Sequence, residues 1–133
     1  MPASIFDAPV LEQVLNFTQA RHNVIAGNIA NIDTPGYRAR DLSPAQFQAQ
    51  LKDAVAASRS QAADPLAEAG EAGDNPFSAV ADTAHTLVYH DDSNIDLEHE
   101  ALELSKNQMQ FNLALSLLTS QFHSLQAAIS ERP

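Results

Sequence analysis

Residues 97–129 carry the most restrictive pattern in the sequence, because large apolar side chains recur there at alternating spacings of four and three. This period is typical of a helix that is buried along one face, as in a coiled coil. At about 1.5 Å per residue, such a helix would be roughly 50 Å long. The sequence therefore predicts a long C-terminal helix with a packing line formed by Leu97, Leu104, Phe111, Leu115, Leu118, Phe122, Leu125 and Ile129.

The same helix lacks the charged face that a surface helix normally turns to water. Residues 107–130 contain no Asp, Glu, Lys or Arg. A second apolar line, called the outer line below, lies about half a turn away from the packing line. Burying it in an assembly would be favourable, at about 25 cal/mol per Å² of apolar surface. We expect contacts with other subunits at the outer line, which comprises Leu102, Met109, Leu113 and Leu117.

Amide side chains are the main polar groups of this helix. Six Asn or Gln residues lie within 107–130, which makes the segment too polar to cross a bilayer. Gln108 falls on the packing line itself. A single amide at such a position can fix the register of two helices at some cost in stability. A solvated break in an imperfect repeat explains Gln108 equally well.

Residues 9–32 form a second predicted helix with a broad apolar face of helical period. Arg21 is the only Asp, Glu, Lys or Arg residue between positions 13 and 32, so this helix also has little charge. Two weakly charged helices at opposite ends of a chain are expected to pair as an antiparallel coiled coil. On the N-terminal helix, the expected packing residues are Leu11, Leu15, Ile25 and Ile29.

The middle of the chain has weaker signals. Ser43 and Pro44 favour the start of a shorter helix over residues 44–58. Residues 59–84 are rich in Ala, Gly, Pro and acidic side chains, which predicts a mobile connection, and residues 86–89 form one extended run. The predicted fold is therefore mainly α. Segments 1–43 and 94–133 form one helical core domain, and segment 44–93 is an irregular, partly extended middle.

A sharp turn is predicted directly after the N-terminal helix. Pro35 disfavours helical geometry at Thr34, and Gly36 can adopt the positive φ that a type II turn requires. Asn31 and Asp33 can bind nearby backbone groups. For a Pro-Gly pair alone, a helix stop followed by a loop is the simplest interpretation.

The full sequence around this turn resembles the signature of the flagellar rod, hook and hook-associated axial proteins. Within that family, the short chain and the segment 94–100 before the long helix resemble the proximal-rod proteins. The FlgC kind usually carries an Ala-Ser-Arg-Ala-Tyr-like stretch in its C-terminal helix, where this chain has other residues at 106–111. The residues that match the family signature are Asn28, Ala30, Asn31, Asp33, Thr34, Pro35, Gly36 and Tyr37.

The resemblance implies a structural subunit of the bacterial flagellar basal body. Such a protein assembles through its terminal helices into the helical tube of the proximal rod, which transmits torque for motility and lines the export channel. It passes through the flagellar type III export apparatus without a cleaved signal peptide and lies in the periplasmic rod. The implied partners are other copies of itself, the axial proteins FlgC, FlgF and FliE, and the MS-ring protein FliF.

Composition excludes several other functions. The formal net charge of −10 does not fit a nucleic-acid-binding surface, and the absence of cysteine excludes a thiolate nucleophile or a zinc–sulfur site. His99 and Glu103 have a spacing that could share a metal ion, but solvated polar side chains are the more common meaning of such a pair. We expect no enzyme activity, cofactor, metal or direct membrane insertion. The alternative function is a small helical adaptor or export chaperone that binds one partner helix.

Overall fold

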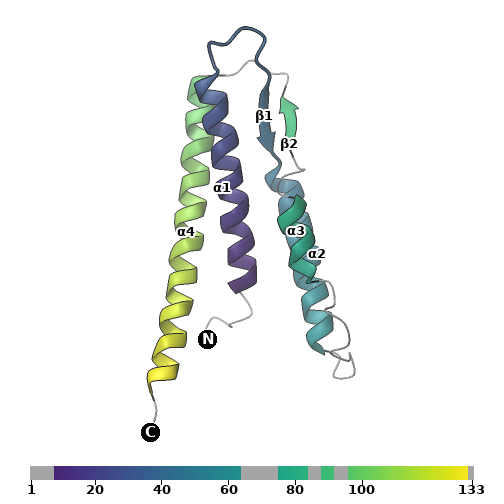
Figure 1. The fold of residues 1–133 in the computed structure, drawn as a ribbon, viewed down its shortest axis with the longest axis vertical. Helices are drawn as coiled ribbons and strands as arrows, with labels where there is room; N and C mark the ends of the chain where they lie inside the picture. The colour runs from purple at the N-terminus through teal and green to yellow at the C-terminus, as the bar shows by residue number, and fades with distance from the viewer. Residues whose placement is uncertain (1–7, 64–74, 84–87, 92–95, 132–133) are drawn as a thin grey trace.

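Helix α1 (Ala8–Ala30) is the element on which the rest of the structure packs. The computed structural model describes residues 8–63, 75–83, 88–91 and 96–131. Helix α4 lies along one side of α1, and α2, α3 and a two-stranded sheet lie on the other (Figure 1). The remaining elements are β1 (Ala39–Leu42), α2 (Pro44–Ala63), α3 (Pro76–Thr83), β2 (Val88–Asp91) and α4 (Leu97–Ser130).

The two terminal helices are paired and antiparallel, which confirms the predicted fold class. The chain ascends along α1 and descends along α4, so the start of α1 and the end of α4 lie at the same end of the pair (Figure 1). Helix α1 has 23 residues and α4 has 34. At about 1.5 Å per residue, α4 is therefore roughly 16 Å longer than the helix it packs on. The extra length lies at its C-terminal end.

Polar side chains cap the starts of three helices. The Asp96 carboxylate accepts a hydrogen bond from the Glu98 N–H at the start of α4. The Ser43 hydroxyl accepts from the Gln46 N–H at the start of α2, over 3.3 Å. The Asn75 side-chain carbonyl oxygen accepts from the Phe77 N–H at the start of α3. Each cap satisfies an N–H group that has no partner within its own helix.

The middle of the chain contains more helix than the sequence analysis predicted. Helix α2 continues to Ala63 instead of ending at residue 58. The prediction of a mobile connection is wrong for Pro76–Thr83, which forms α3; residues 64–74 lie outside the described residues. Phe77 and Val80 are three residues apart and both are buried, so one face of this short helix packs on its neighbours. Packing stabilises a helix that is too short to form alone.

A short two-stranded sheet packs against α1 near the turn that follows this helix (Figure 1). Strand β1 was not predicted, and it pairs antiparallel with β2 in a register that places Ala39 opposite Asp91 and Leu42 opposite Val88. The expected extended run at 86–89 falls partly on β2, and residues 86–87 lie outside the described part of the chain. An isolated two-stranded ribbon is marginal in water. The contact of β1 with α1 therefore stabilises the sheet.

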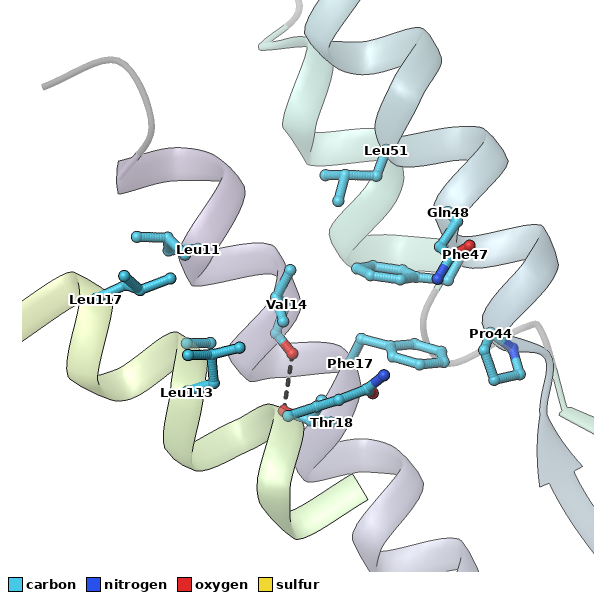
Figure 2. A pocket seen from close by; sticks show the side chains of 12 residues that line it. Leu11, Val14, Phe17, Thr18, Pro44, Phe47, Gln48, Leu51, Leu113 and Leu117 are labelled. Carbon is cyan, nitrogen blue, oxygen red and sulfur yellow. Dashed lines mark hydrogen bonds between the residues drawn. The ribbon is translucent and has the colours of Figure 1, made fainter. Parts of the chain in front are cut away.

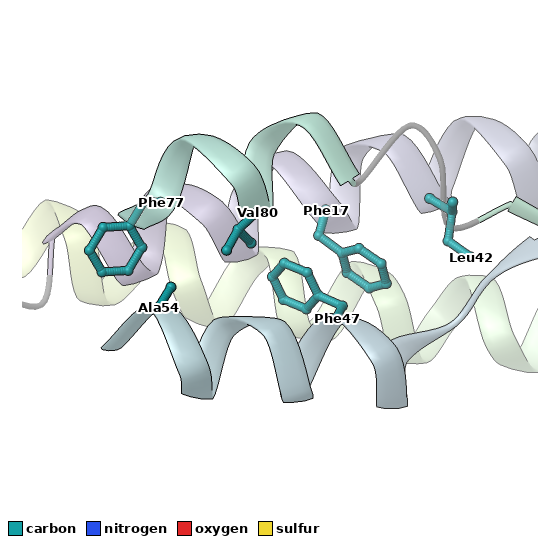
Figure 3. Packing of buried hydrophobic residues seen from close by; sticks show 6 residues of the cluster. All are labelled: Phe17, Leu42, Phe47, Ala54, Phe77 and Val80. Carbon is teal, nitrogen blue, oxygen red and sulfur yellow. The ribbon is translucent and has the colours of Figure 1, made fainter. Parts of the chain in front are cut away.

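The hydrophobic core lies between α1 and the α2–α3 pair (Figure 3). Phe17 of α1 and Phe47 of α2 stack with ring centroids 4.1 Å apart and an angle of 9° between the ring planes. Such a pair adds a directional contact to the burial of both rings. The other core side chains are Leu42, Ala54, Phe77 and Val80, flanked by Val10, Val14, Ala20, Val24, Leu51 and Val55.

Replacing Phe47 by alanine should destabilise the protein by about 3–5 kcal/mol, because it removes a buried ring and leaves a cavity beside Phe17. Urea unfolding followed by far-ultraviolet circular dichroism measures this change. The matched control is Phe122→Ala, since Phe122 is 60% exposed and should change the free energy of unfolding by less than about 0.5 kcal/mol. Equal losses in the two variants would contradict this assignment of the core.

Candidate functional site

The turn that follows α1 has the geometry its residues predict. Gly36 has a φ of 76°, in the left-handed region that favours glycine. The Tyr37 N–H donates to the Thr34 carbonyl over 3.2 Å, which closes the turn around Pro35 and Gly36. The Asn31 side chain also donates to the Gly27 carbonyl at the end of the helix, over 2.9 Å. These bonds direct the chain back alongside α1.

The side chain of Asn28 joins this turn to three other parts of the fold. Its carbonyl oxygen accepts from the Tyr37 hydroxyl and from the Arg40 N–H, both over 3.1 Å. Its amino group donates to the Arg40 carbonyl over 2.6 Å and to a Glu100 carboxylate oxygen of α4 over 3.3 Å. Asn28 is only 1% exposed, so these four bonds satisfy a fully buried amide.

This contact also covers one edge of β1. In a strand, the N–H and C=O of one residue point to the same edge, and Asn28 binds both groups of Arg40. Strand β2 occupies the opposite edge of β1, away from α1 (Figure 1). The Asn28 amide therefore takes the place that a neighbouring strand would fill, and it fixes the register of β1 against α1.

A charged cluster joins α1, β1 and α4 below the turn. Arg21 donates two hydrogen bonds to the Asp41 carboxylate, both over 3.0 Å, and a third to Glu103 over 2.9 Å. The two-bond geometry is specific to the planar guanidinium group. Glu103 also accepts from Lys106 on its exposed side. The lone charge in the middle of α1 is thus a buried connector between its two neighbours.

Charge pairing dominates the electrostatics of this cluster. Burial by itself lowers the pKa of Arg21, but the bonded carboxylates of Asp41 and Glu103 outweigh burial and raise the pKa above its ordinary value. For Glu103, burial raises the pKa, whereas the bonds from Arg21 and Lys106 lower it to a net value below the ordinary one. Arg21 and Glu103 are therefore both charged at neutral pH.

A second amide lies at the middle of the α1–α4 contact. Asn107 is 1% exposed, and its amino group donates to the Thr18 carbonyl over 2.7 Å. Gln108, the amide considered for this role from the sequence, is instead exposed and donates to Asn112. The buried amide that can fix the register of the two helices is thus Asn107, and the exposed Gln108 fits the alternative of a solvated break in the repeat. The side of α4 that faces α1 carries Glu100, Glu103, Leu104, Asn107, Phe111, Ala114, Leu118 and Gln121.

Some of the predicted packing residues are buried or half-buried, and the others are exposed. On α1, Ile25 is buried and Leu11, Leu15 and Ile29 are half-buried. On α4, Leu104, Phe111 and Leu118 are half-buried against α1. The other members of the packing line are exposed in the isolated chain; they are Leu97, Leu115, Phe122, Leu125 and Ile129.

The outer line is exposed throughout its length, with exposed fractions between 48% at Leu117 and 73% at Met109. Leu113 and Leu117 form one wall of an apolar groove of about 340 Å³ between α1, α2 and α4. Figure 2 shows these two leucines facing the groove beside Leu11 and Val14 of α1, with Phe47 and Leu51 of α2 across from them. The groove has no charged side chain in its lining.

Other kinds of site have little support within the described ranges. No group of three potential metal ligands is present among residues 8–63, 75–83, 88–91 and 96–131. His99 is exposed, and Glu103 is engaged by Arg21. In the same ranges, no helix is both long enough and apolar enough to cross a membrane. The exposed apolar surface of α4 is the candidate interaction surface among the described residues.

Comparison with known proteins assigns the signature turn to a family. A family model described as "Flagella basal body rod protein" matches residues 12–38, which cover most of α1 and the whole turn. FlgB of Bacillus subtilis is 29% identical over 129 residues, spanning 96% of this chain and 97% of that protein. FlgB of Salmonella typhimurium is 28% identical over 121 residues, or 86% of each chain. These matches support a flagellar basal-body rod protein of the FlgB kind.

FlgB of Escherichia coli is likewise 28% identical over 121 residues. These alignments span the middle of the chain as well as its ends, whereas the sequence signature lies in the first third. The match to FlgB proteins also agrees with the departure from the FlgC pattern at residues 106–111. In the fold described here, the signature residue Asn28 connects the turn, β1 and α4.

Replacing Asn28 by alanine should lower the free energy of unfolding by about 2–4 kcal/mol, because the Arg40 backbone and the Tyr37 hydroxyl lose their buried partner. Chemical unfolding of the purified chain measures the change. Asn23→Ala is the control, since Asn23 lies on the same helix and is exposed. If both variants unfolded at the same denaturant concentration, the proposed structural importance of Asn28 would be wrong.

The Glu103–Arg21 contact should make stability depend on acid pH. The pKa of Glu103 is lower in the folded chain, so its contribution is complete above the ordinary glutamate pKa of about 4.3 and is lost as pH falls through the folded value. Glu103→Gln should cost about 1.5–3 kcal/mol at neutral pH and much less near pH 3. Unfolding curves from about pH 7 to pH 3 test this, with exposed Glu98→Gln as the control. A pH-independent difference between wild type and Glu103→Gln would refute it.

Proposed function

We infer that this chain is a structural subunit of the flagellar basal-body rod that is joined to its neighbours through α4. The carrying observation is the combination of similarity to FlgB proteins with a long helix whose apolar outer surface has no partner in the described chain. Similarity to FlgB proteins indicates that the assembly is the flagellar rod. The exposed apolar surface provides the physical reason for the subunits to associate.

Helix α4 exposes more large apolar side chains than is usual for a helix that stays in contact with water. Leu102, Met109 and Leu113 are each more than half exposed, on a helix with no charged residue from 107 to 130. Contiguous apolar surface of this kind marks an interaction site on a protein. Its burial between subunits would provide the main favourable free energy of assembly.

The proposed position is the proximal part of the rod, in the periplasm. There, copies of the chain would contact one another and the other axial proteins FlgC, FlgF and FliE, with the MS-ring protein FliF at the base. The family resemblance supports these neighbours, together with passage through the flagellar export apparatus without a cleaved signal peptide. The function is mechanical, and the proposal includes no catalytic step.

The antiparallel α1–α4 pair suits this mechanical role. Contacts from α1 to α4 run from Asn28 and Glu100 at the turn to Thr18 and Asn107 further along the pair. A pair of long helices transmits force along its axis with little change in length. Side-by-side pairs would form the wall of a tube, which would transmit torque and leave an axial channel for export.

Replacing Leu113 by glutamate should abolish swimming and reduce incorporation into basal bodies at least tenfold, because it places a charge on the apolar surface that neighbours would cover. Expression and export should be unchanged. The measurements are spreading in soft agar and immunoblots of purified basal bodies. The control is Ala57→Glu, which adds the same charge at an exposed position of α2.

Normal swimming of the Leu113→Glu strain would contradict the role of this surface in assembly. Mass measurement of the purified wild-type chain with candidate axial proteins separates the rod function from the adaptor alternative. A rod subunit should form extended species of increasing mass. A single heterodimer with one helical partner, together with absence from basal bodies, would overturn the rod function.

A further inference from the structure

We propose that the groove between α1, α2 and α4 receives the C-terminal end of α4 from a second copy of this chain. The proposal rests on the rod-subunit function above and names the contact through which one copy binds the next. Two separate features of the fold support it. One is an apolar groove that no described residue fills, and the other is an apolar helix end that extends beyond its own partner helix.

The groove has the lining expected for an apolar helix. Its walls are Leu11, Val14 and Phe17 of α1, Phe47 and Leu51 of α2, and Leu113 and Leu117 of α4 (Figure 2). Its volume of about 340 Å³ is in the range of known ligand-binding pockets, so the groove is large enough to hold side chains of a docked helix. Gln48 and Gln110 also line the groove and can bind the polar side chains of an uncharged helix.

The C-terminal end of α4 (residues 122–130) has the complementary pattern. Phe122, Leu125 and Ile129 follow one another at spacings of three and four and are 60%, 37% and 64% exposed. They continue the side of α4 that faces α1, but they lie beyond the start of α1 at Ala8 (Figure 1). Apolar anchors at these spacings are the usual means by which a helix binds a groove.

Charge favours a second copy at this contact. The whole chain has a formal net charge of −10, so two copies repel each other over most orientations. Neither the groove lining nor residues 122–130 include an Asp, Glu, Lys or Arg. Docking the helix end into the groove therefore brings together two uncharged surfaces and keeps the acidic side chains of the two copies off the contact.

The two surfaces differ from each other, which determines the kind of assembly. Each copy presents one groove and one helix end, so every copy can bind one neighbour through each. Contacts of this head-to-tail type produce rings or open helical assemblies, whereas a self-complementary patch produces a closed dimer. A rod is an assembly of the open helical type.

The contact is of moderate size. Phe122, Leu125, Ile129, Leu113 and Leu117 together expose roughly 450 Å² of apolar surface, taking roughly 170 Å² for one fully exposed large side chain. This is roughly half of the apolar area of a standard interface. One such contact is weak in dilute solution. In an assembly each copy makes it twice, once with its groove and once with its helix end.

Engineered disulfides test the proposal directly, because the chain contains no cysteine. The test variant combines Gln48→Cys at the groove with Ile129→Cys on the helix end. The control variant combines Ala57→Cys with Ile129→Cys, since Ala57 is exposed and lies about half a turn around α2 from Gln48. Both variants replace the chain in a motile strain, and basal bodies are analysed by non-reducing electrophoresis.

We expect a ladder of cross-linked multimers at least fivefold stronger for Gln48→Cys/Ile129→Cys than for the control. The two single-cysteine chains, Gln48→Cys and Ile129→Cys, purified, mixed and oxidised at high concentration, should form the mixed disulfide-linked heterodimer. Equal cross-linking of test and control, or dimers formed only by Ile129→Cys with itself, would overturn the groove contact. Absence of the wild-type chain from basal bodies would instead overturn the rod function, and the purified mixture would still decide the groove contact.

Discussion

The buried amide of Asn28 is the interaction on which the arrangement of the elements depends. One side chain at the end of α1 binds the turn through Tyr37, the backbone of β1 through Arg40, and α4 through Glu100. An asparagine can make these four bonds because its amide has both an acceptor and two donors. A carboxylate or an aliphatic side chain of similar size would leave part of this set unpaired. The direction in which the chain leaves α1 is fixed at the same point where α4 begins its contact with α1.

The elements with strong local sequence signals could be predicted. The elements that depend on tertiary contacts could not. The period of two long helices and the turn at Pro35 and Gly36 were sufficient to predict both helices and their antiparallel pairing. Strand β1 has only four residues, and the Asn28 amide that supports it is distant in sequence. Helix α3 did have a local signal in Asn75 and Pro76, but its eight residues sit in a composition typical of loops. The apolar period of α4 did not reveal that Asn107 is buried against α1, because apolar residues occur on nearly every side of that helix.

The α1–α4 contact contains more buried polar side chains than a usual pair of packed helices. It contains Arg21, Glu103 and Asn107, and most large apolar side chains of α4 are exposed in the isolated chain. The apolar core lies instead between α1 and the α2–α3 pair. Buried polar contacts give register and specificity more than net stability, because the desolvation of each group offsets much of its bond energy. Hydrogen bonds thus define where α4 lies, and its exposed apolar surface stays available for the contacts between subunits proposed above.

This distribution has a consequence for the order in which the folded chain comes apart. Opening of α4 away from α1 breaks hydrogen bonds and ion pairs and exposes half-buried side chains such as Phe111, but Ala114 is the only buried apolar side chain of α4. Opening of the core separates Phe17 from Phe47, which are both buried. Segments that bury little apolar surface are the first to open in native-state fluctuations. Amide protons of α4 should therefore exchange with solvent sooner than those of α1 and α2. A subunit built in this way can release its longest helix without unfolding the rest, and it can dock that helix again when a neighbour is present.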